Sequence, residues 1–140
     1  MKKICFFSGD ITRSGGTERV GTVIANELHK RGQFEISIVS LWEDKKKTFF
    51  HLEQGIKRDT LFSEHVSGKK ILTYVKAVKK YVENNKIDVL VDIDGILDLY
   101  SIPALKKNKC KLVSWEQFNY YVNPYVNYRK LTRKMAAKKA

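Results

Sequence analysis

The chain has 140 residues, of which 43% are hydrophobic and 30% are charged, and its formal net charge is +12. This length allows one domain with a hydrophobic core of its own. No apolar run approaches the roughly 20 residues of a transmembrane helix, and the N-terminal apolar stretch is too short for a signal peptide. We therefore expect a cytoplasmic protein.

The first predicted unit is a strand, a turn and a helix. Residues 4–7 are apolar and predict a short buried strand. After the turn, apolar residues recur at helical spacing and predict a helix whose core-facing stripe consists of Val20, Val23, Ile24 and Leu28. Gly32 is the stop signal of this helix, and residues 35–41 alternate toward a second strand. Strand, helix and strand in this order predict a parallel sheet with a right-handed crossover.

The glycine-rich turn lies where the predicted helix begins. Unpaired N–H groups at a helix N-terminus attract phosphates and other anions, so Gly15 and Gly16 are candidates for an anion-binding turn. The glycines do not fit the dinucleotide pattern G-x-G-x-x-G, and Thr22 stands where a P-loop requires lysine. The alternative interpretation is that the two glycines only allow a tight turn with positive φ.

The rest of the chain alternates between predicted strands and helices. We expect a short strand at 48–52, a helix at 71–85, a buried strand at 88–92, a partly helical stretch at 96–107, a strand at 111–115 and a basic helix at 126–140. This order predicts an α/β fold with a Rossmann-like, doubly wound parallel sheet. Ligands of such sheets bind at the carboxyl ends of the strands. Three segments should therefore lie near a ligand: 15–16, 92–95 and 116–119.

Two of these segments have a structural as well as a functional interpretation. Asp92 and Asp94 resemble an Asp-x-Asp metal motif, but two aspartates beside Gly95 are also a typical turn, which we favour. The three histidines lack ligand spacing, so neither a metal nor another cofactor is expected. Residues 115–121 combine aromatic rings with polar groups. They form either an edge of the core or a wall that stacks on a sugar ring.

The net charge concerns the partners of the chain rather than its fold. The lysines are spread through the chain and form no recognised nucleic-acid-binding signature, so no nucleic acid is expected. We favour a solvated lysine-rich surface, and contact with an anionic membrane surface is the alternative. Cys5 and Cys110 lie in predicted strands, and we expect both thiols to be free in a reducing compartment.

With these residues in hand, two motifs resemble the N-terminal domain of a GT-B glycosyltransferase of the family 4 (group 1) type. The first lies within residues 14–32 and starts with Ser-Gly-Gly-Thr-Glu-Arg-Val, and Gln33 follows where a histidine is common. The second lies at 113–120 and is similar to a Trp-Glu-x-Phe-Asn stretch of related bacterial enzymes. Gln117 stands where that stretch often has histidine. The resemblance covers nearly the whole chain.

The resemblance implies two Rossmann-like domains with a cleft between them, of which the N-terminal one mainly binds the acceptor. The implied reaction is retaining transfer of a sugar from a nucleotide diphosphate sugar to an acceptor hydroxyl, without a metal. Stabilisation of the leaving diphosphate would be the main catalytic contribution. The expected donor-diphosphate residues are Gly15, Gly16 and Thr17. The expected acceptor residues are Asp94, Glu116, Gln117 and Asn119. No catalytic residue is assigned.

Residues 1–140 are therefore expected to be a single acceptor-side domain that lacks the nucleotide-sugar domain and is inactive alone. The chain ends inside a predicted helix without a cap, which suggests a piece of a longer protein. Synthesis of cell-envelope polysaccharide or glycolipid, with a sugar, polymer or lipid acceptor at the inner face of the membrane, is the setting that the resemblance implies. Two alternatives stay open: a non-catalytic subunit of a split transferase, and a basic α/β domain that binds nucleic acid.

Overall fold

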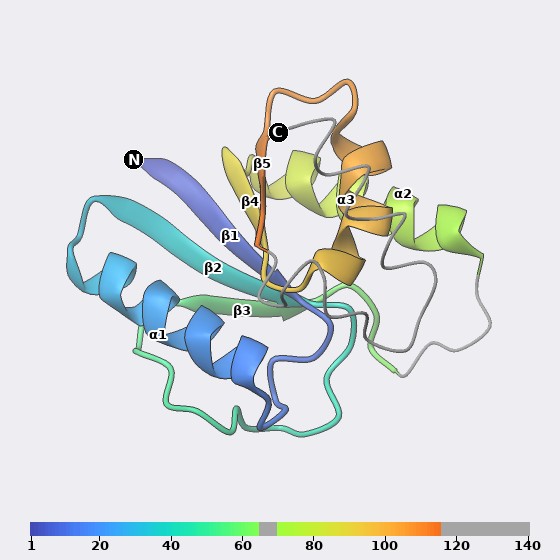
Figure 1. Ribbon diagram of the computed structural model, residues 1–140. Helices are drawn as coiled ribbons and strands as arrows, with labels where there is room; N and C mark the ends of the chain where they lie inside the picture. Colours follow the sequence, from blue (N-terminus) through green and yellow to red (C-terminus); the bar gives the residue numbers. More distant parts are fainter. Residues whose placement is uncertain (65–69, 116–140) are drawn as a thin grey trace, which may run out of the picture.

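The computed structural model describes residues 1–64 and 70–115. Within them, five strands form one parallel sheet with helices on both faces (Figure 1). The strands are β1 (Lys2–Ser8), β2 (Phe34–Ser40), β3 (Lys57–Thr60), β4 (Val89–Asp92) and β5 (Lys111–Ser114). The helices are α1 (Gly16–Lys30), α2 (Ile71–Asn85), α3 (Asp98–Leu105) and a 3-10 helix, η1 (Gly95–Leu97). The basic helix expected at 126–140 lies outside the described residues.

The sheet has the strand order β3-β2-β1-β4-β5, and all neighbouring strands are parallel. In the central register, Phe6 of β1 lies between Ile38 of β2 and Val91 of β4. The chain therefore winds outward from β1 to β3 and then returns to the other side of β1. This reversal makes β1 and β4 the switch point of a doubly wound sheet, and the predicted Rossmann-like fold is confirmed.

The core consists of two hydrophobic clusters, because the side chains of β1 alternate between the two faces of the sheet. Phe6 packs in the same cluster as Ala25 of α1. Phe7 packs in the other cluster, with Val82 of α2 and Leu105 of α3. Accordingly, α1 covers one face of the sheet, and α2 and α3 cover the opposite face (Figure 1).

The core-facing side of α1 differs from the predicted one. The exposed fractions of Val20, Val23 and Ile24 are 36%, 52% and 38%, and of the expected stripe Leu28 alone packs against the core. The buried residues of α1 are Glu18, Gly21, Thr22 and Ala25. The predicted helix is confirmed, but its predicted orientation is wrong. Hydropathy predicts that the larger apolar residues of α1 face the core. In the structure, the side of α1 with the smaller residues packs against the sheet instead.

Replacing Gly21 with valine is expected to lower the free energy of unfolding by about 2 kcal/mol, because overpacked cores lose 1–3 kcal/mol. A Cβ at Gly21 would lie 3.1 Å from Cδ1 of Ile93, so a branched side chain has no room. Val23→Ser on the exposed side of the same helix is the matched control, with an expected loss below about 0.5 kcal/mol. Urea unfolding monitors both variants, and equal losses would contradict the observed orientation of α1.

The third strand lies later in the chain than predicted. Residues 48–52 form no strand, and β3 consists of four polar residues, none of which is buried. β3 pairs with β2 alone, at the edge of the sheet. An edge strand with little covering needs backbone pairing but no apolar side chains, so hydropathy does not mark it. The apolar residue Phe49, which suggested the earlier strand, is 63% exposed.

The two cysteines are free and buried. Cys5 lies in β1, and Cys110 directly precedes β5. Burial is the main cause that raises the pKa of the Cys5 thiol to about 12 and that of the Cys110 thiol to about 11. Both thiols therefore stay protonated and unreactive near neutral pH. No helix of the described segments is long and apolar enough to cross a bilayer.

Candidate functional site

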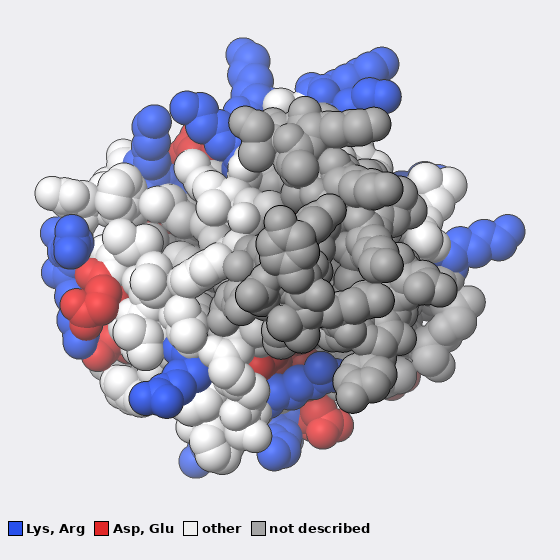
Figure 2. Space-filling model, viewed as in Figure 1, with Lys and Arg blue, Asp and Glu red and all other residues white. Residues whose placement is uncertain are grey.

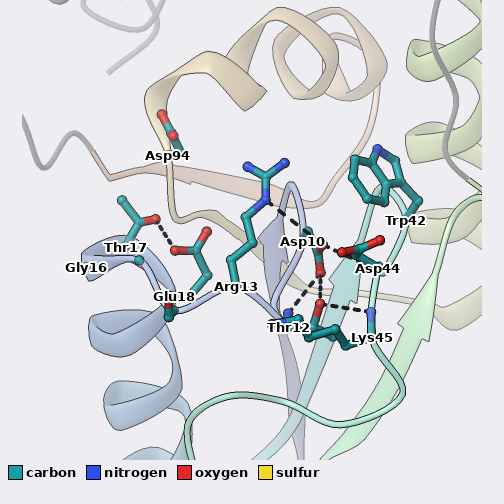
Figure 3. Close-up of a pocket in the computed structure, with 12 residues that line it drawn as sticks. Asp10, Thr12, Arg13, Gly16, Thr17, Glu18, Trp42, Asp44, Lys45 and Asp94 are labelled. Atoms are coloured by element: carbon teal, nitrogen blue, oxygen red, sulfur yellow. Dashed lines mark hydrogen bonds and ion pairs between the residues drawn. The ribbon is translucent and has the colours of Figure 1, made fainter.

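A pocket of about 900 Å³ lies at the carboxyl ends of β1, β2 and β4. Its walls come from the turn after β1, the start of α1, the segment after β2 and the turn after β4 (Figure 3). The lining residues are Asp10, Thr12, Arg13, Ser14, Gly15, Gly16, Thr17, Glu18, Trp42, Asp44, Lys45 and Asp94. The pocket thus lies beside the switch point of the sheet, where doubly wound proteins bind ligands.

The structure brings together four of the residues that we singled out from the sequence. Gly15, Gly16 and Thr17 lie on one wall of the pocket, and Asp94 lies on the wall formed by the turn after β4 (Figure 3). The other expected acceptor residues, Glu116, Gln117 and Asn119, lie outside the described residues.

The glycine turn does not use positive φ. Gly15 has φ −74° and ψ 164°, and among the described glycines only Gly32 and Gly55 have positive φ. The interpretation of the turn as a positive-φ device is therefore wrong. A Cβ at Gly15 would collide with the carboxylate of Glu18, whereas nothing lies within 4 Å of a Cβ at Gly16. Gly16 consequently leaves open space next to the backbone at the start of α1.

The N-terminus of α1 opens into the pocket with free backbone donors. The backbone N–H of Arg19 makes the first helical hydrogen bond, to the carbonyl oxygen of Gly15 at 3.1 Å, so the preceding N–H groups lack helical acceptors. The carboxylate of Glu18 folds back to this end and accepts a hydrogen bond from Thr17 Oγ1 at 3.0 Å. An acidic group is favourable at the positive end of the helix dipole. This end of α1 is therefore suited to anions.

Asp10 is the buried centre of the pocket floor, with 1% of its surface exposed. Its Oδ1 accepts hydrogen bonds from the backbone N–H of Thr12 at 2.9 Å and from Thr12 Oγ1 at 2.5 Å. Its Oδ2 accepts the backbone N–H of Asp44 at 3.2 Å. Thr12 Oγ1 in turn accepts the backbone N–H of Lys45 at 3.3 Å. One carboxylate thus joins the turn after β1 to the segment after β2 (Figure 3).

A cation and an aromatic ring lie above this floor. The guanidinium carbon of Arg13 lies 5.7 Å from the centroid of the Trp42 ring, which is within cation–π range. Nε of Arg13 lies 4.0 Å from Oδ2 of Asp10. The exposed side chain of Lys45 adds a second cation to the lining. The pocket therefore offers cations for a phosphate, carboxylates for hydroxyl groups and an apolar ring face.

A buried pair of carboxyl groups lies close behind the turn that carries Asp94. Oδ1 of Asp92 accepts a hydrogen bond from Ser101 Oγ at 2.8 Å, and Ser114 Oγ donates to Asp98 Oδ2. Burial, and next the hydrogen bond to Asp98 and its charge, raise the pKa of Asp92 well above its ordinary range. Ionising both of two neighbouring carboxyl groups in a dry site is unfavourable, so we expect the pair to share one proton. The pair ties β4, β5 and α3 together behind the pocket.

Asp94 itself belongs to a turn, as we favoured from the sequence. Its side chain accepts the backbone N–H of Ile96 at 3.2 Å and thereby caps η1. In the described part of the chain, no group of three or more His, Cys, Asp or Glu side chains is arranged to hold a metal ion.

The comparisons with known proteins agree on one family of folds. No protein-family model matches the chain. A protein of Haemophilus influenzae named as an uncharacterized glycosyltransferase is 33% identical over 121 residues, which are 86% of this chain and 33% of that protein. The apo structure of the lipopolysaccharide outer core galactosyltransferase WaaB matches with a TM-score of 0.58 and 25% identity, over 84% of this chain and 34% of that one. The resemblance to the N-terminal domain of GT-B glycosyltransferases is confirmed.

A second solved structure supports the fold of this GT-B-type domain. A glycosyltransferase from Rickettsia africae matches with a TM-score of 0.59 over 93% of this chain and 33% of that chain. Its identity is 14%, so this likeness concerns the fold alone. The chain spans about a third of the length of the curated relative that it matches.

Several pocket residues of the GT-B-type domain escaped the sequence analysis. Asp10 and Arg13 lie in the turn after β1, and Trp42 lies in the segment after β2. The rule that selected the turns after the other strands also applies to the end of β2, but residues 42–45 form no glycine turn or known motif. The sequence therefore marks these pocket residues only by their position after the end of a predicted strand.

Proposed function

We propose that the chain is the acceptor-side domain of a glycosyltransferase that transfers a sugar from a nucleotide diphosphate sugar to an acceptor hydroxyl. The observation that carries this proposal is the pocket at the switch point, where the open N-terminus of α1 faces Asp94. The likeness to proteins named as glycosyltransferases supports it. Since the chain spans about a third of those proteins, the activity is proposed for the whole protein that contains such a domain.

The donor diphosphate is proposed to approach the start of α1. Gly16 is the point of closest approach, because the space beside its Cα is open, and the backbone N–H groups of Gly16 and Thr17 would stabilise the charge of the leaving diphosphate. Gly15 holds the turn extended and leaves room for the carboxylate of Glu18. A diphosphate bound here lies next to that carboxylate, so its contacts would concentrate on the side of Gly16.

The acceptor is proposed to bind on the opposite wall of the pocket. The carboxylate of Asp94 would accept hydrogen bonds from sugar hydroxyls, and the ring of Trp42 offers an apolar face for stacking. Glu116, Gln117 and Asn119 stay part of this proposal as further acceptor residues.

The proposal extends to the setting of the reaction. The enzyme would be of the retaining family 4 type, with the nucleotide bound on a second domain, so the chain by itself would not turn over its substrates. Its acceptor would be an envelope polysaccharide or a glycolipid precursor, reached from the cytoplasmic face of the membrane. WaaB, a galactosyltransferase of the lipopolysaccharide outer core by name, matches this setting.

Replacing Gly16 with valine is expected to reduce transfer by at least about 100-fold, the loss typical when a donor to developing negative charge is blocked. The fold should persist, because no atom lies within 4 Å of the added Cβ. The assay follows release of nucleoside diphosphate from a panel of nucleotide sugars, with the longest protein product that contains this chain.

Gly9→Val is the matched control for that experiment. Gly9 also has open space around a Cβ, but it does not line the pocket. We expect it to keep its turnover. Unchanged transfer by the Gly16 variant would remove the glycine turn from the mechanism, and a wild-type protein that consumes no nucleotide sugar would overturn the transferase proposal.

A further inference from the structure

The outer side of α1 is an apolar stripe between cations. Val20, Val23 and Ile24 follow one another at helical spacing, and all three are exposed. Arg19 and Arg31 lie beside the stripe near the two ends of the helix and are exposed. Within 1–64 and 70–115, neither arginine pairs with a carboxylate. Exposed apolar side chains on a helix with unpaired cations are typical of interaction surfaces.

The segment between β2 and β3 lies along this helix and runs in the same direction. At the pocket end, the backbone N–H of Lys45 bonds to Thr12, which precedes α1. Farther along α1, the Asn26 side chain donates to the carbonyl oxygen of His51 at 2.8 Å and accepts the N–H of Glu53 at 3.0 Å. Residues between these two anchor points therefore lie beside the first half of α1.

Phe49 and a run of lysines extend the stripe onto this loop. Phe49 is 63% exposed, and residues 45–47, all lysine, are exposed and end two positions before it. We call Val20, Val23, Ile24 and Phe49, together with Arg19 and residues 45–47, the α1–loop face. Figure 2 shows an uncharged area over α1 that is bordered by Lys and Arg side chains and, at its left and lower edges, also by Asp and Glu side chains. The acidic groups Glu27 and Glu53 lie toward the other end of α1, where both pair with Lys30, at 3.3 and 3.5 Å.

We propose that the α1–loop face binds the anionic surface of a lipid bilayer. The apolar side chains would enter the headgroup region, and the cations would contact lipid phosphates. Charge complementarity favours this occupant, because the apolar residues are interspersed with unpaired cations and the chain has a net charge of +12. Sugar transfer is not needed for this binding.

The position of the face relative to the pocket gives the binding a role. Gly16 at the start of α1 and Lys45 at the start of the lysine run both line the pocket, so the face begins at the pocket mouth. An acceptor held in the membrane would therefore reach the pocket without leaving the bilayer surface. This role rests on the proposed transferase function, whereas the binding itself can be measured without any sugar.

Co-sedimentation with vesicles tests the proposal. The chain is mixed with vesicles of phosphatidylcholine alone, or of phosphatidylcholine and phosphatidylglycerol in equal amounts, and the bound fraction is measured at low and high salt. We expect binding to the anionic vesicles that weakens with added salt. An equal bound fraction with both compositions, or no bound fraction with either, would overturn the proposal.

Two double variants locate the binding on the face. We expect Val23→Ser with Phe49→Ser to weaken vesicle binding about tenfold, and Lys46→Gln with Lys47→Gln to weaken it at least about tenfold, since each lysine near an anionic surface contributes about fivefold. All four side chains are exposed, so the fold should be unaffected.

The opposite layer of the molecule offers matched controls. Ile71 and Leu72 at the start of α2 are 54% and 59% exposed, and Lys79 and Lys80 are exposed on the same helix. Ile71→Ser with Leu72→Ser, and Lys79→Gln with Lys80→Gln, make the same chemical changes there and should leave binding unchanged. If these controls weaken binding as much as the face variants, the charge of the whole chain and not the α1–loop face is responsible, and the proposal is wrong.

Discussion

Replacing Asp10 with alanine is expected to lower the free energy of unfolding by about 3 kcal/mol, because it leaves buried donors without an acceptor. The carboxylate is 1% exposed and accepts three hydrogen bonds, two from Thr12 and one from the backbone of Asp44. Without it, the turn after β1 and the segment after β2 lose their common anchor. The pocket floor should therefore loosen together with the loss of stability.

Urea unfolding of two variants measures this effect. Asp44→Ala is the control, since it removes a carboxylate from the same pocket but an exposed one, whose backbone N–H still reaches Asp10. We expect its loss to stay below about 0.5 kcal/mol. Similar losses for the two variants would contradict the role of Asp10 as the anchor.

The second large effect concerns the buried pair of Asp92 and Asp98. The raised pKa of Asp92 means that the folded protein keeps a proton that the unfolded chain loses above about pH 4. The contribution of the pair to stability is therefore fully present below about pH 4 and decreases as the pH rises toward the folded pKa. In this window the expected slope is about −1.4 kcal/mol of unfolding free energy per pH unit.

Asp92→Asn should remove that slope. The amide has no proton to lose, its N–H can donate to Asp98, and its oxygen can still accept from Ser101. We expect the variant to match the wild type near pH 4 and to exceed it increasingly at higher pH. Asp92→Leu is the control for packing, and near pH 4, where the wild type holds its proton, it should be less stable than the wild type by about 3 kcal/mol, because Ser101 and Asp98 lose their partner.

Unfolding free energies from pH 4 to pH 9 decide this prediction. The quantity to compare is the difference between Asp92→Asn and the wild type, since the slopes of all other groups cancel in it. Parallel curves would mean that the two carboxyl groups do not share a proton. A loss for Asp92→Asn as large as that for Asp92→Leu would mean that the amide cannot replace the shared proton.

The βαβ beginning and the turn at Asp94 were predictable because they depend on local patterns. The helix stop at Gly32 follows from its φ of +68°, which favours glycine in the left-handed region. The turn interpretation of Asp94 follows from its capping bond to Ile96 within the same short segment. In both cases the residues that decide the structure are neighbours in the chain.

The errors arose where a distant segment decides the outcome. α1 turns its small residues inward because Gly21 lies against Ile93, which is 72 positions away in the chain. β3 is a strand because β2 offers a free edge, and none of its side chains is buried. Neither contact has a signature in the residues of the segment itself.

The sequence by itself therefore determined the order of elements, the parallel Rossmann-like sheet and the place of the candidate pocket at its strand ends, since hydrophobic periodicity and turn residues act over a few positions. The tertiary structure alone decided which side of α1 faces the sheet, that Asp10 joins two separate segments, and that Asp92 and Asp98 form a buried pair. These features depend on the packing of segments that are distant in the chain. The same packing holds the loop with Phe49 against α1 and leaves both Phe49 and Val23 exposed. The α1–loop face therefore could not be predicted from the sequence.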